Sequence, residues 1–144
     1  MKRRASALWQ GNGPEGKGTL NSTSGVLKET PYSVYTRFVS EDGKAGTNPE
    51  ELIAAAHSAC FTMALSFVLG GAGFTPVALN ATATVTVDKV EDHFVIKSSH
   101  LDLVGEVPGI SEEKFIELAG IAKATCPVSV ALKAIEVTLT AKLK

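Results

Sequence analysis

One stretch of the chain, residues 47–69 (TNPEELIAAAHSACFTMALSFVL), constrains the fold more than any other. Pro49 suits the first position of a helix, and Asn48 followed three residues later by Glu51 has the spacing of a capping box. After Glu51 no residue of the stretch is charged, unless His57 is protonated. Because the following residues are apolar on every face, the pattern predicts a long buried central helix rather than a surface helix.

A helix with so few charges could also span a membrane, for which about 20 apolar residues suffice. His57 and several hydroxyl residues interrupt the run, and patterned strands surround it, so we expect no membrane contact. Along the predicted helix, an apolar stripe at spacings of three and four residues carries Cys60. It comprises Ile53, Ala56, His57, Cys60, Met63, Ala64 and Phe67.

The size and charge of the chain narrow its class. With 144 residues, we expect a single domain covering residues 1–144. The net charge of −1 offers no basic surface for nucleic acid. Residues 2–4 are basic, but no apolar segment follows them, so we expect no signal peptide. Two cysteines are too few for the disulfide framework of a secreted protein, and we expect a cytoplasmic one.

Alternation of apolar and polar residues predicts six strands. They cover residues 5–10, 19–23, 32–39, 77–87, 94–104 and 135–143. Ser111 can cap a second helix, and Pro127 suits the start of a short third helix that continues over residues 128–133. The apolar face of the second helix is Phe115, Leu118, Ala119 and Ala122. This order predicts an α+β fold with antiparallel sheets around the central helix.

Burial of the central helix requires more than one sheet. Strands with alternating patterns bury only one face, so a single sheet covers one side of the helix. The two later helices are short for covering the other side. A second copy of the chain would supply the missing cover, and we therefore expect an intertwined homodimer with two-fold symmetry.

Cys60 and Cys126 are the first candidates for chemistry, and two interpretations of them are open. They can be buried core thiols, because free cysteine is among the most buried residue types, or they can be redox-active. Cys126 precedes Pro127 at a predicted helix start, where the helix dipole favours the thiolate. Cys60 lies in mid-helix, where burial disfavours ionisation, so as a nucleophile it needs a cation from elsewhere in the fold.

Arg37, inside the predicted strand 32–39, is the candidate cation, and Glu50 at the start of the central helix is its candidate partner. The simpler interpretations are an arginine whose head group is solvated and a glutamate that stabilises the helix dipole. The glycine-rich segment 11–18 lacks the spacing of a phosphate-binding loop.

A metal centre is a third kind of candidate site. His57 and Cys60, three residues apart on a helix, could join Cys126 and either His93 or His100 as ligands. No second close pair of ligands is present in the sequence. We therefore expect no metal, and we expect His57 to be a hydrogen-bonded core histidine.

Four segments together resemble the osmotically inducible protein C / organic hydroperoxide resistance (OsmC/Ohr) family. They are GKGTL, PYSVYTRF, TNPEELIAAAHSACFTMAL and KATCPVS, and they run in this order through nearly the whole chain. The combination is specific, whereas CPVS alone would not be. The OsmC branch fits better than the Ohr branch, because Arg37 falls in the segment before the helix, whereas Ohr proteins carry this arginine nearer the N-terminus.

The resemblance implies a thiol-dependent peroxidase that reduces organic hydroperoxides, and often hydrogen peroxide, as an intertwined homodimer with active sites at the interface. By motif, Cys60 is the peroxidatic cysteine and Cys126 the resolving cysteine, while Arg37 stabilises the thiolate and Glu50 positions Arg37. No cofactor is implied. An external thiol reductant restores the enzyme, and lipoylated proteins are the usual donors in the Ohr branch.

The competing class is a non-catalytic dimer that binds a small apolar ligand and uses its cysteines for packing. In the peroxidase, Phe61, Met63 and Phe67 could form an apolar wall for the alkyl chain of the substrate, although core packing is their default interpretation.

Helix geometry predicts a site shared between subunits. Glu50 precedes Cys60 by about 15 Å along the helix axis and lies roughly 80° away around it. Antiparallel central helices across a two-fold axis would bring Glu50 of one chain level with Cys60 of the other. We therefore expect at least one of Arg37 and Glu50 to reach Cys60 from the partner subunit.

Overall fold

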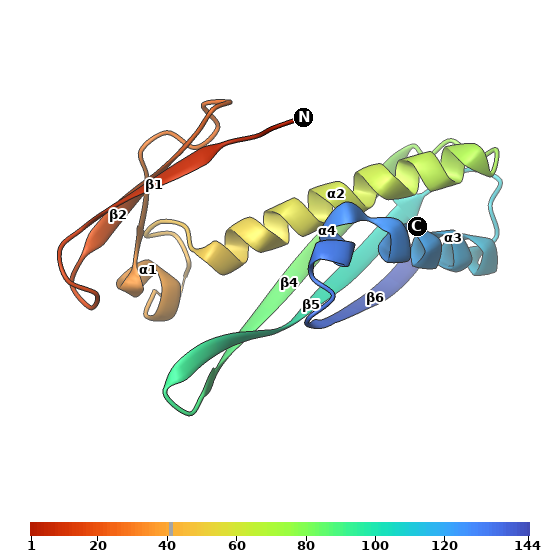
Figure 1. Ribbon diagram of the computed structural model, residues 1–144. Helices are drawn as coiled ribbons and strands as arrows, with labels where there is room; N and C mark the ends of the chain where they lie inside the picture. Colours follow the sequence, from red (N-terminus) through yellow and green to blue (C-terminus); the bar gives the residue numbers. More distant parts are fainter. Residues whose placement is uncertain (41) are drawn as a thin grey trace. The chain divides into compact units, whose positions relative to one another are not determined.

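The computed structural model describes residues 1–40 and 42–144, and Figure 1 shows the path of the chain. The chain divides into two compact units, an N-terminal unit (Met1–Leu52) and a C-terminal unit (Ile53–Lys144). In chain order, the elements are β1 (Ala5–Gln10), β2 (Lys17–Ser22), β3 (Thr30–Ser33), α1 (Val34–Phe38), α2 (Pro49–Gly71), β4 (Ala78–Val90), β5 (His93–Glu106), α3 (Glu112–Thr125), α4 (Pro127–Ala131) and β6 (Glu136–Leu143).

The N-terminal unit is built on an antiparallel sheet in the order β1-β2-β3. The strand predicted at residues 5–10 is confirmed, and the one predicted at 19–23 overlaps β2, which begins two residues earlier and ends at Ser22. The rings of Trp9 and Tyr32 pack with their centroids 5.4 Å apart. Gly18 lies against this pair, and a Cβ atom there would collide with the Tyr32 ring. Glycine at position 18 therefore leaves the space that the Tyr32 ring occupies beside Trp9.

The prediction of one strand over residues 32–39 is wrong after Ser33. Residues from Val34 onward form α1, because Ser33 starts a capping box. The Ser33 hydroxyl accepts from the Thr36 backbone N–H at 3.1 Å, and the Thr36 hydroxyl accepts from the Ser33 N–H at 2.8 Å. Thr36 also donates to the Thr47 carbonyl at 3.0 Å. These local hydrogen bonds outweigh the strand preference of the aromatic and β-branched residues.

The start of α2 follows the sequence prediction. Asn48 Oδ1 accepts from the Glu51 backbone N–H at 2.8 Å, which is the expected cap. The Glu51 carboxylate accepts instead from the Thr47 hydroxyl at 2.6 Å. By length and composition α2 could cross a membrane. One face of α2 nevertheless lies in the hydrophobic core, with Phe61, Leu65 and Leu69 buried there.

The sheet of the C-terminal unit has the order β4-β5-β6. β4 and β5 form the predicted antiparallel hairpin, but β6 runs parallel to β5, so the expectation of purely antiparallel sheets is wrong here. The reason is the connection: α3 and α4 lie between β5 and β6, and this helical crossover returns the chain to the same end of the sheet (Figure 1).

The core of the C-terminal unit lies between the sheet and the helices. α2 contributes one face with a four-residue spacing, His57, Phe61, Leu65 and Leu69, all fully buried. β5 adds Leu101 and Leu103, and α3 adds Phe115, Leu118, Ala119 and Ala122. The α3 face and its cap at Ser111, which accepts from the Lys114 N–H at 3.2 Å, are as predicted.

The burial of α2 is one-sided in the single chain. Met63 is 64% exposed and Phe67 76% exposed, and Ala56 and Ala59 lie on the same exposed face. The predicted stripe is therefore divided, because His57 is buried while Met63 and Phe67 are not. An exposed apolar face of this kind agrees with the argument that one sheet covers one side of the helix.

Candidate active site

Cys60 and Cys126 meet in the C-terminal unit. Cys60 lies in the middle of α2 and is partly buried. Cys126 is fully buried at the junction of α3 and α4, where it is the N-cap of α4. Both are free thiols, and their side chains are within hydrogen-bonding reach of one another. The fold thus joins two cysteines that lie far apart in the sequence.

The surroundings of Cys126 favour its thiolate. Burial by itself raises the pKa of Cys126, but hydrogen bonds outweigh burial and bring the pKa below its ordinary value of 9.0. The donors are the backbone N–H groups of Ser129 and Val128, the Ser129 hydroxyl and the Cys60 thiol. These N–H groups are free to donate because the first turn of a helix leaves them without intrahelical partners. The predicted effect of the helix start at Pro127 is therefore present.

The surroundings of Cys60 do the opposite. Burial raises the pKa of Cys60, and the neighbouring Cys126 raises it further. A hydrogen bond from the Val128 backbone N–H lowers the pKa but only in part. This outcome agrees with the expectation that a thiol in the middle of α2 needs a cation from elsewhere before it ionises at neutral pH.

Arg37 and Glu50 form an ion pair in the N-terminal unit. Arg37 Nη2 lies 2.6 Å from Glu50 Oε1, and Nε lies 3.2 Å from Oε1 and 3.1 Å from Oε2. The Glu50 side chain is 9% exposed and that of Arg37 33% exposed. The Arg37 guanidinium also lies 4.7 Å from the centre of the Phe38 ring. The predicted pairing is thus present, with Arg37 on the helix α1 rather than on a strand.

His57 is the hydrogen-bonded core histidine that the sequence predicts. Its Nδ1 lies 2.7 Å from the Ser99 hydroxyl of β5, and its Nε2 lies 2.8 Å from the Ser129 hydroxyl of α4. Burial lowers the pKa of His57, so the ring is neutral at neutral pH. Sequence analysis missed Ser99 and Ser129. Ser129 belongs to the KATCPVS segment, but nothing local marks Ser99 in its strand.

Two further predictions from the sequence concern an apolar wall and a metal site. Phe61 is fully buried, whereas Met63 and Phe67 are exposed, so the three residues do not form one apolar wall within the chain. Within residues 1–40 and 42–144, no three His, Cys, Asp or Glu residues are grouped as metal ligands.

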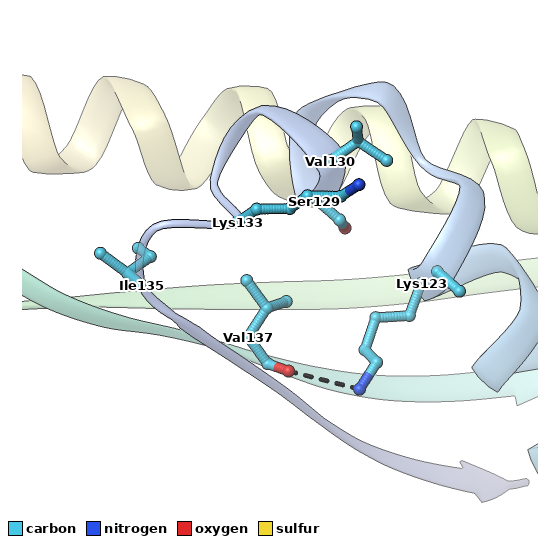
Figure 2. Close-up of a pocket in the computed structure, with 7 residues that line it drawn as sticks. Lys123, Ser129, Val130, Lys133, Ile135 and Val137 are labelled. Atoms are coloured by element: carbon cyan, nitrogen blue, oxygen red, sulfur yellow. Dashed lines mark hydrogen bonds between the residues drawn. The ribbon is translucent and has the colours of Figure 1, made fainter.

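A pocket opens beside α4, and Figure 2 shows the residues that line it. Ser129 and Val130 come from α4, and Ile135 and Val137 come from the segment that enters β6. Lys123 of α3 donates from Nζ to the Val137 carbonyl at 3.3 Å. Ser129 therefore both lines this pocket and hydrogen-bonds to His57.

Comparison with known proteins shows the family of the chain. Residues 41–140 match the OsmC family model, described as OsmC-like protein. The chain is 50% identical to peroxiredoxin OsmC of Escherichia coli K12 over 144 residues, which is 100% of the chain and 98% of the relative. It is 29% identical over 117 residues to the organic hydroperoxide resistance protein OhrB of Bacillus subtilis, covering 81% of the chain and 82% of OhrB.

Solved structures extend the similarity to the fold. An organic hydroperoxide resistance protein from Elizabethkingia anophelis superposes with a TM-score of 0.72 at 30% identity, covering 100% of this chain and 97% of that one. An OsmC-like protein of Vibrio cholerae has a TM-score of 0.76 at 15% identity over 99% of both chains, which shows the shared fold. The chain therefore belongs to the OsmC family, and it is a thiol-dependent peroxidase.

Proposed function

We propose that Cys60 is the peroxidatic cysteine and Cys126 the resolving cysteine of this peroxidase, which reduces organic hydroperoxides and also hydrogen peroxide. The observation that carries the assignment is the contact between the two thiols, in a chain half identical to a peroxiredoxin. Relatives named for organic hydroperoxide resistance support the substrate class.

The chemistry has three steps. The Cys60 thiolate attacks the distal peroxide oxygen, the O–O bond breaks, and Cys60 sulfenic acid and an alcohol form. The Cys126 thiolate then attacks the Cys60 sulfur; the S–S bond forms, the S–O bond breaks, and the leaving oxygen is protonated to water. An external thiol finally reduces the Cys60–Cys126 disulfide by exchange.

Arg37 supplies the cation that Cys60 lacks. Burial raises the pKa of Cys60, so a positive charge beside the sulfur is needed to favour the thiolate at neutral pH. Glu50 holds the Arg37 guanidinium through two nitrogen atoms, which fixes its orientation. At least one of the two residues reaches Cys60 from the partner subunit, because helix geometry separates Glu50 from Cys60 by about 15 Å.

A site shared between subunits requires a homodimer. The exposed face of α2, with Met63 and Phe67 at its centre, is the surface that a second copy would cover. The chain as a whole, residues 1–144, acts as one OsmC-like domain in the cytoplasm. It needs no bound cofactor, and a small or protein dithiol, including a lipoylated protein, serves as the reductant.

A second candidate function is a dimer that binds small apolar ligands and uses its cysteines only for packing. Thiol-dependent consumption of cumene hydroperoxide by wild type and Cys60→Ser separates the two, with Ser66→Ala as a control on the same helix. We expect rapid turnover by wild type and Ser66→Ala and none by Cys60→Ser. Equally slow consumption by all three proteins would contradict the assignment of Cys60.

A further inference from the structure

His57 is fully buried in α2, and the three steps above give it no role. Both of its ring nitrogens are nevertheless bound, to Ser99 of β5 at 2.7 Å and to Ser129 of α4 at 2.8 Å. Ser129 follows Cys126 by three residues in the first turn of α4, where its hydroxyl lies within reach of the Cys126 sulfur, and that sulfur in turn lies close to Cys60. Ser99, His57, Ser129 and Cys126 thus form a chain of hydrogen bonds that crosses the core and ends at the cysteine pair.

The hydrogen bonds of this network can all point in one of two directions, with donors and acceptors exchanged. When Cys126 is a thiolate, the Ser129 hydroxyl donates to sulfur and accepts from His57 Nε2–H, and His57 Nδ1 accepts from the Ser99 hydroxyl. When Cys126 is a thiol, every hydrogen bond can reverse: the thiol donates to Ser129, Ser129 donates to Nε2, and Nδ1–H donates to Ser99. In either direction both ring nitrogens of His57 and the Ser129 hydroxyl have a partner, which is a condition for a stable polar network in a core.

Burial of these four side chains strengthens the hydrogen bonds that join them. Ser99 and His57 are fully buried, Cys126 is fully buried, and Ser129 is 7% exposed. Hydrogen bonds in such surroundings are stronger than in water, because water does not compete for the groups. The hydrogen-bond partners of His57 are two uncharged serine hydroxyls.

We infer that Ser129 and His57 are positioning residues for the resolving step, which hold the Cys126 sulfur and orient it as a thiolate toward the Cys60 sulfur. The inference rests on the proposed roles of the two cysteines. It gives the HSACF and TCPVS segments a role beyond their cysteines. The first supplies His57 together with Cys60, and the second supplies Ser129 together with Cys126.

The step balances without a further reactant. Cys60 sulfenic acid and Cys126 thiol give the disulfide and water. The Cys126 sulfur donates an electron pair to the Cys60 sulfur, and the leaving oxygen takes the pair from the S–O bond. The attack uses the Cys126 thiolate: the proton that the thiol gives up goes to solvent water, and solvent water gives an equal proton to the leaving oxygen, while His57 stays neutral and orients the Ser129 hydroxyl. Ser129 also lines the pocket of Figure 2, beside α4.

The test measures the two chemical steps separately in Ser129→Ala. After one equivalent of cumene hydroperoxide, quenched samples are alkylated and weighed by mass spectrometry, which distinguishes thiol, sulfenic acid trapped by dimedone, and disulfide. We expect Cys60 oxidation at the rate of the wild type and disulfide formation slowed by at least about 10-fold. Ser129→Thr keeps the hydroxyl and should restore most of the rate.

A matched control is available in the same unit. Thr138 Oγ1 lies 2.6 Å from His100 Nδ1, which is the same kind of bond, but in the part of the chain that the structure describes neither residue hydrogen-bonds to a cysteine. Thr138→Val should leave both steps unchanged. Disulfide formation in Ser129→Ala as fast as in wild type would overturn the inference, and so would an equal slowing of both steps. If wild type itself formed no Cys60–Cys126 disulfide, the proposed function would fail first.

A second readout concerns the tautomer of His57, which a purely structural role would not set. Nitrogen-15 NMR of the reduced protein, at a pH where Cys126 is a thiolate, should show the proton on Nε2. Cys126→Ala removes the anion and should abolish this preference. A reduced wild type with the proton on Nδ1 would contradict the polarity proposed for the network.

Discussion

Arg37 grips the Glu50 carboxylate through two of its nitrogen atoms, with Nη2 2.6 Å from Oε1 and Nε 3.1 Å from Oε2. The Glu50 side chain is almost fully buried, so it cannot turn to solvent when the pair is disturbed. A charge-assisted, two-point contact fixes both the position and the plane of the guanidinium. The orientation of the Arg37 guanidinium therefore depends on Glu50.

Glu50→Gln should lower kcat/KM for cumene hydroperoxide by about 100-fold, because a guanidinium displaced by even an ångström no longer meets the thiolate correctly. Steady-state kinetics with a dithiol reductant measures this. Glu51→Gln is the matched control, since it removes a charge from the same helix turn but has no bond to Arg37. Equal losses in both variants would assign the effect to the helix dipole instead.

Cys126→Ser should react once with peroxide and then stop at Cys60 sulfenic acid, because the thiol that resolves it is missing. Mass spectrometry after one equivalent of peroxide should find one added oxygen atom in this variant and a disulfide in wild type. External thiol should then resolve the sulfenic acid slowly. A variant that turns over like wild type would remove the resolving role from Cys126.

The pH dependence of Cys60 reactivity should change when Arg37 is removed. Only the thiolate reacts, so its rate rises with pH and levels off above the pKa. Burial raises the pKa of Cys60 above its ordinary value, and without the guanidinium only the hydrogen bond from the Val128 N–H opposes this effect. Iodoacetamide alkylation of Arg37→Ala should therefore still be rising at pH 9, whereas wild type should reach its plateau at lower pH. Coincident profiles would argue against Arg37 as the cation.

Charge on the exposed face of α2 should separate the subunits. Met63→Glu places a carboxylate on the surface that we expect to be buried in the dimer, where an unpaired charge is costly. Light scattering after size-exclusion chromatography should show a monomer with little peroxidase activity. Ile116→Glu on α3, which is 47% exposed, is the comparable control and should remain dimeric. A dimeric Met63→Glu variant would place the interface elsewhere.

Mixing two inactive variants tests whether the site is shared. Cys60→Ser and Arg37→Ala homodimers should each be inactive, and subunit exchange between them should regenerate up to one intact site per heterodimer. Activity should therefore return toward about a quarter of wild type at complete exchange, since half of the dimers carry one intact site out of two. No recovery, with exchange verified by mass spectrometry, would show that Arg37 acts on its own chain.

Local signals in the sequence were sufficient for most of the helices and strands. The caps at Asn48 and Ser111, the long apolar run of α2 and the alternation in β4 and β5 each depend on residues within a few positions of one another. The failure at residues 32–39 was also local. Ser33 and Thr36 form a capping box, which strand propensity obscured.

The direction of β6 could not be predicted in this way. Whether β6 pairs with β5 in parallel depends on the end of the sheet to which α3 and α4 return the chain. That is a property of the tertiary structure. The same is true of the face of α2 that is buried. Its residues are apolar nearly all round, so their order alone does not distinguish the face packed on β5 and α3 from the exposed face of Met63 and Phe67.

The candidate residues for chemistry could be named from the sequence: two cysteines, one at a helix start and one in mid-helix, and an arginine and a glutamate that could pair. Which of them meet could not be named, because the proximity of Cys60 to Cys126 and the link that His57 makes between Ser99 and Ser129 arise from the folding of distant segments. The reason is physical. Residue type and helix position set the intrinsic reactivity of a group, but hydrogen bonds and desolvation, which set its actual pKa and its partner, come from segments distant in the chain.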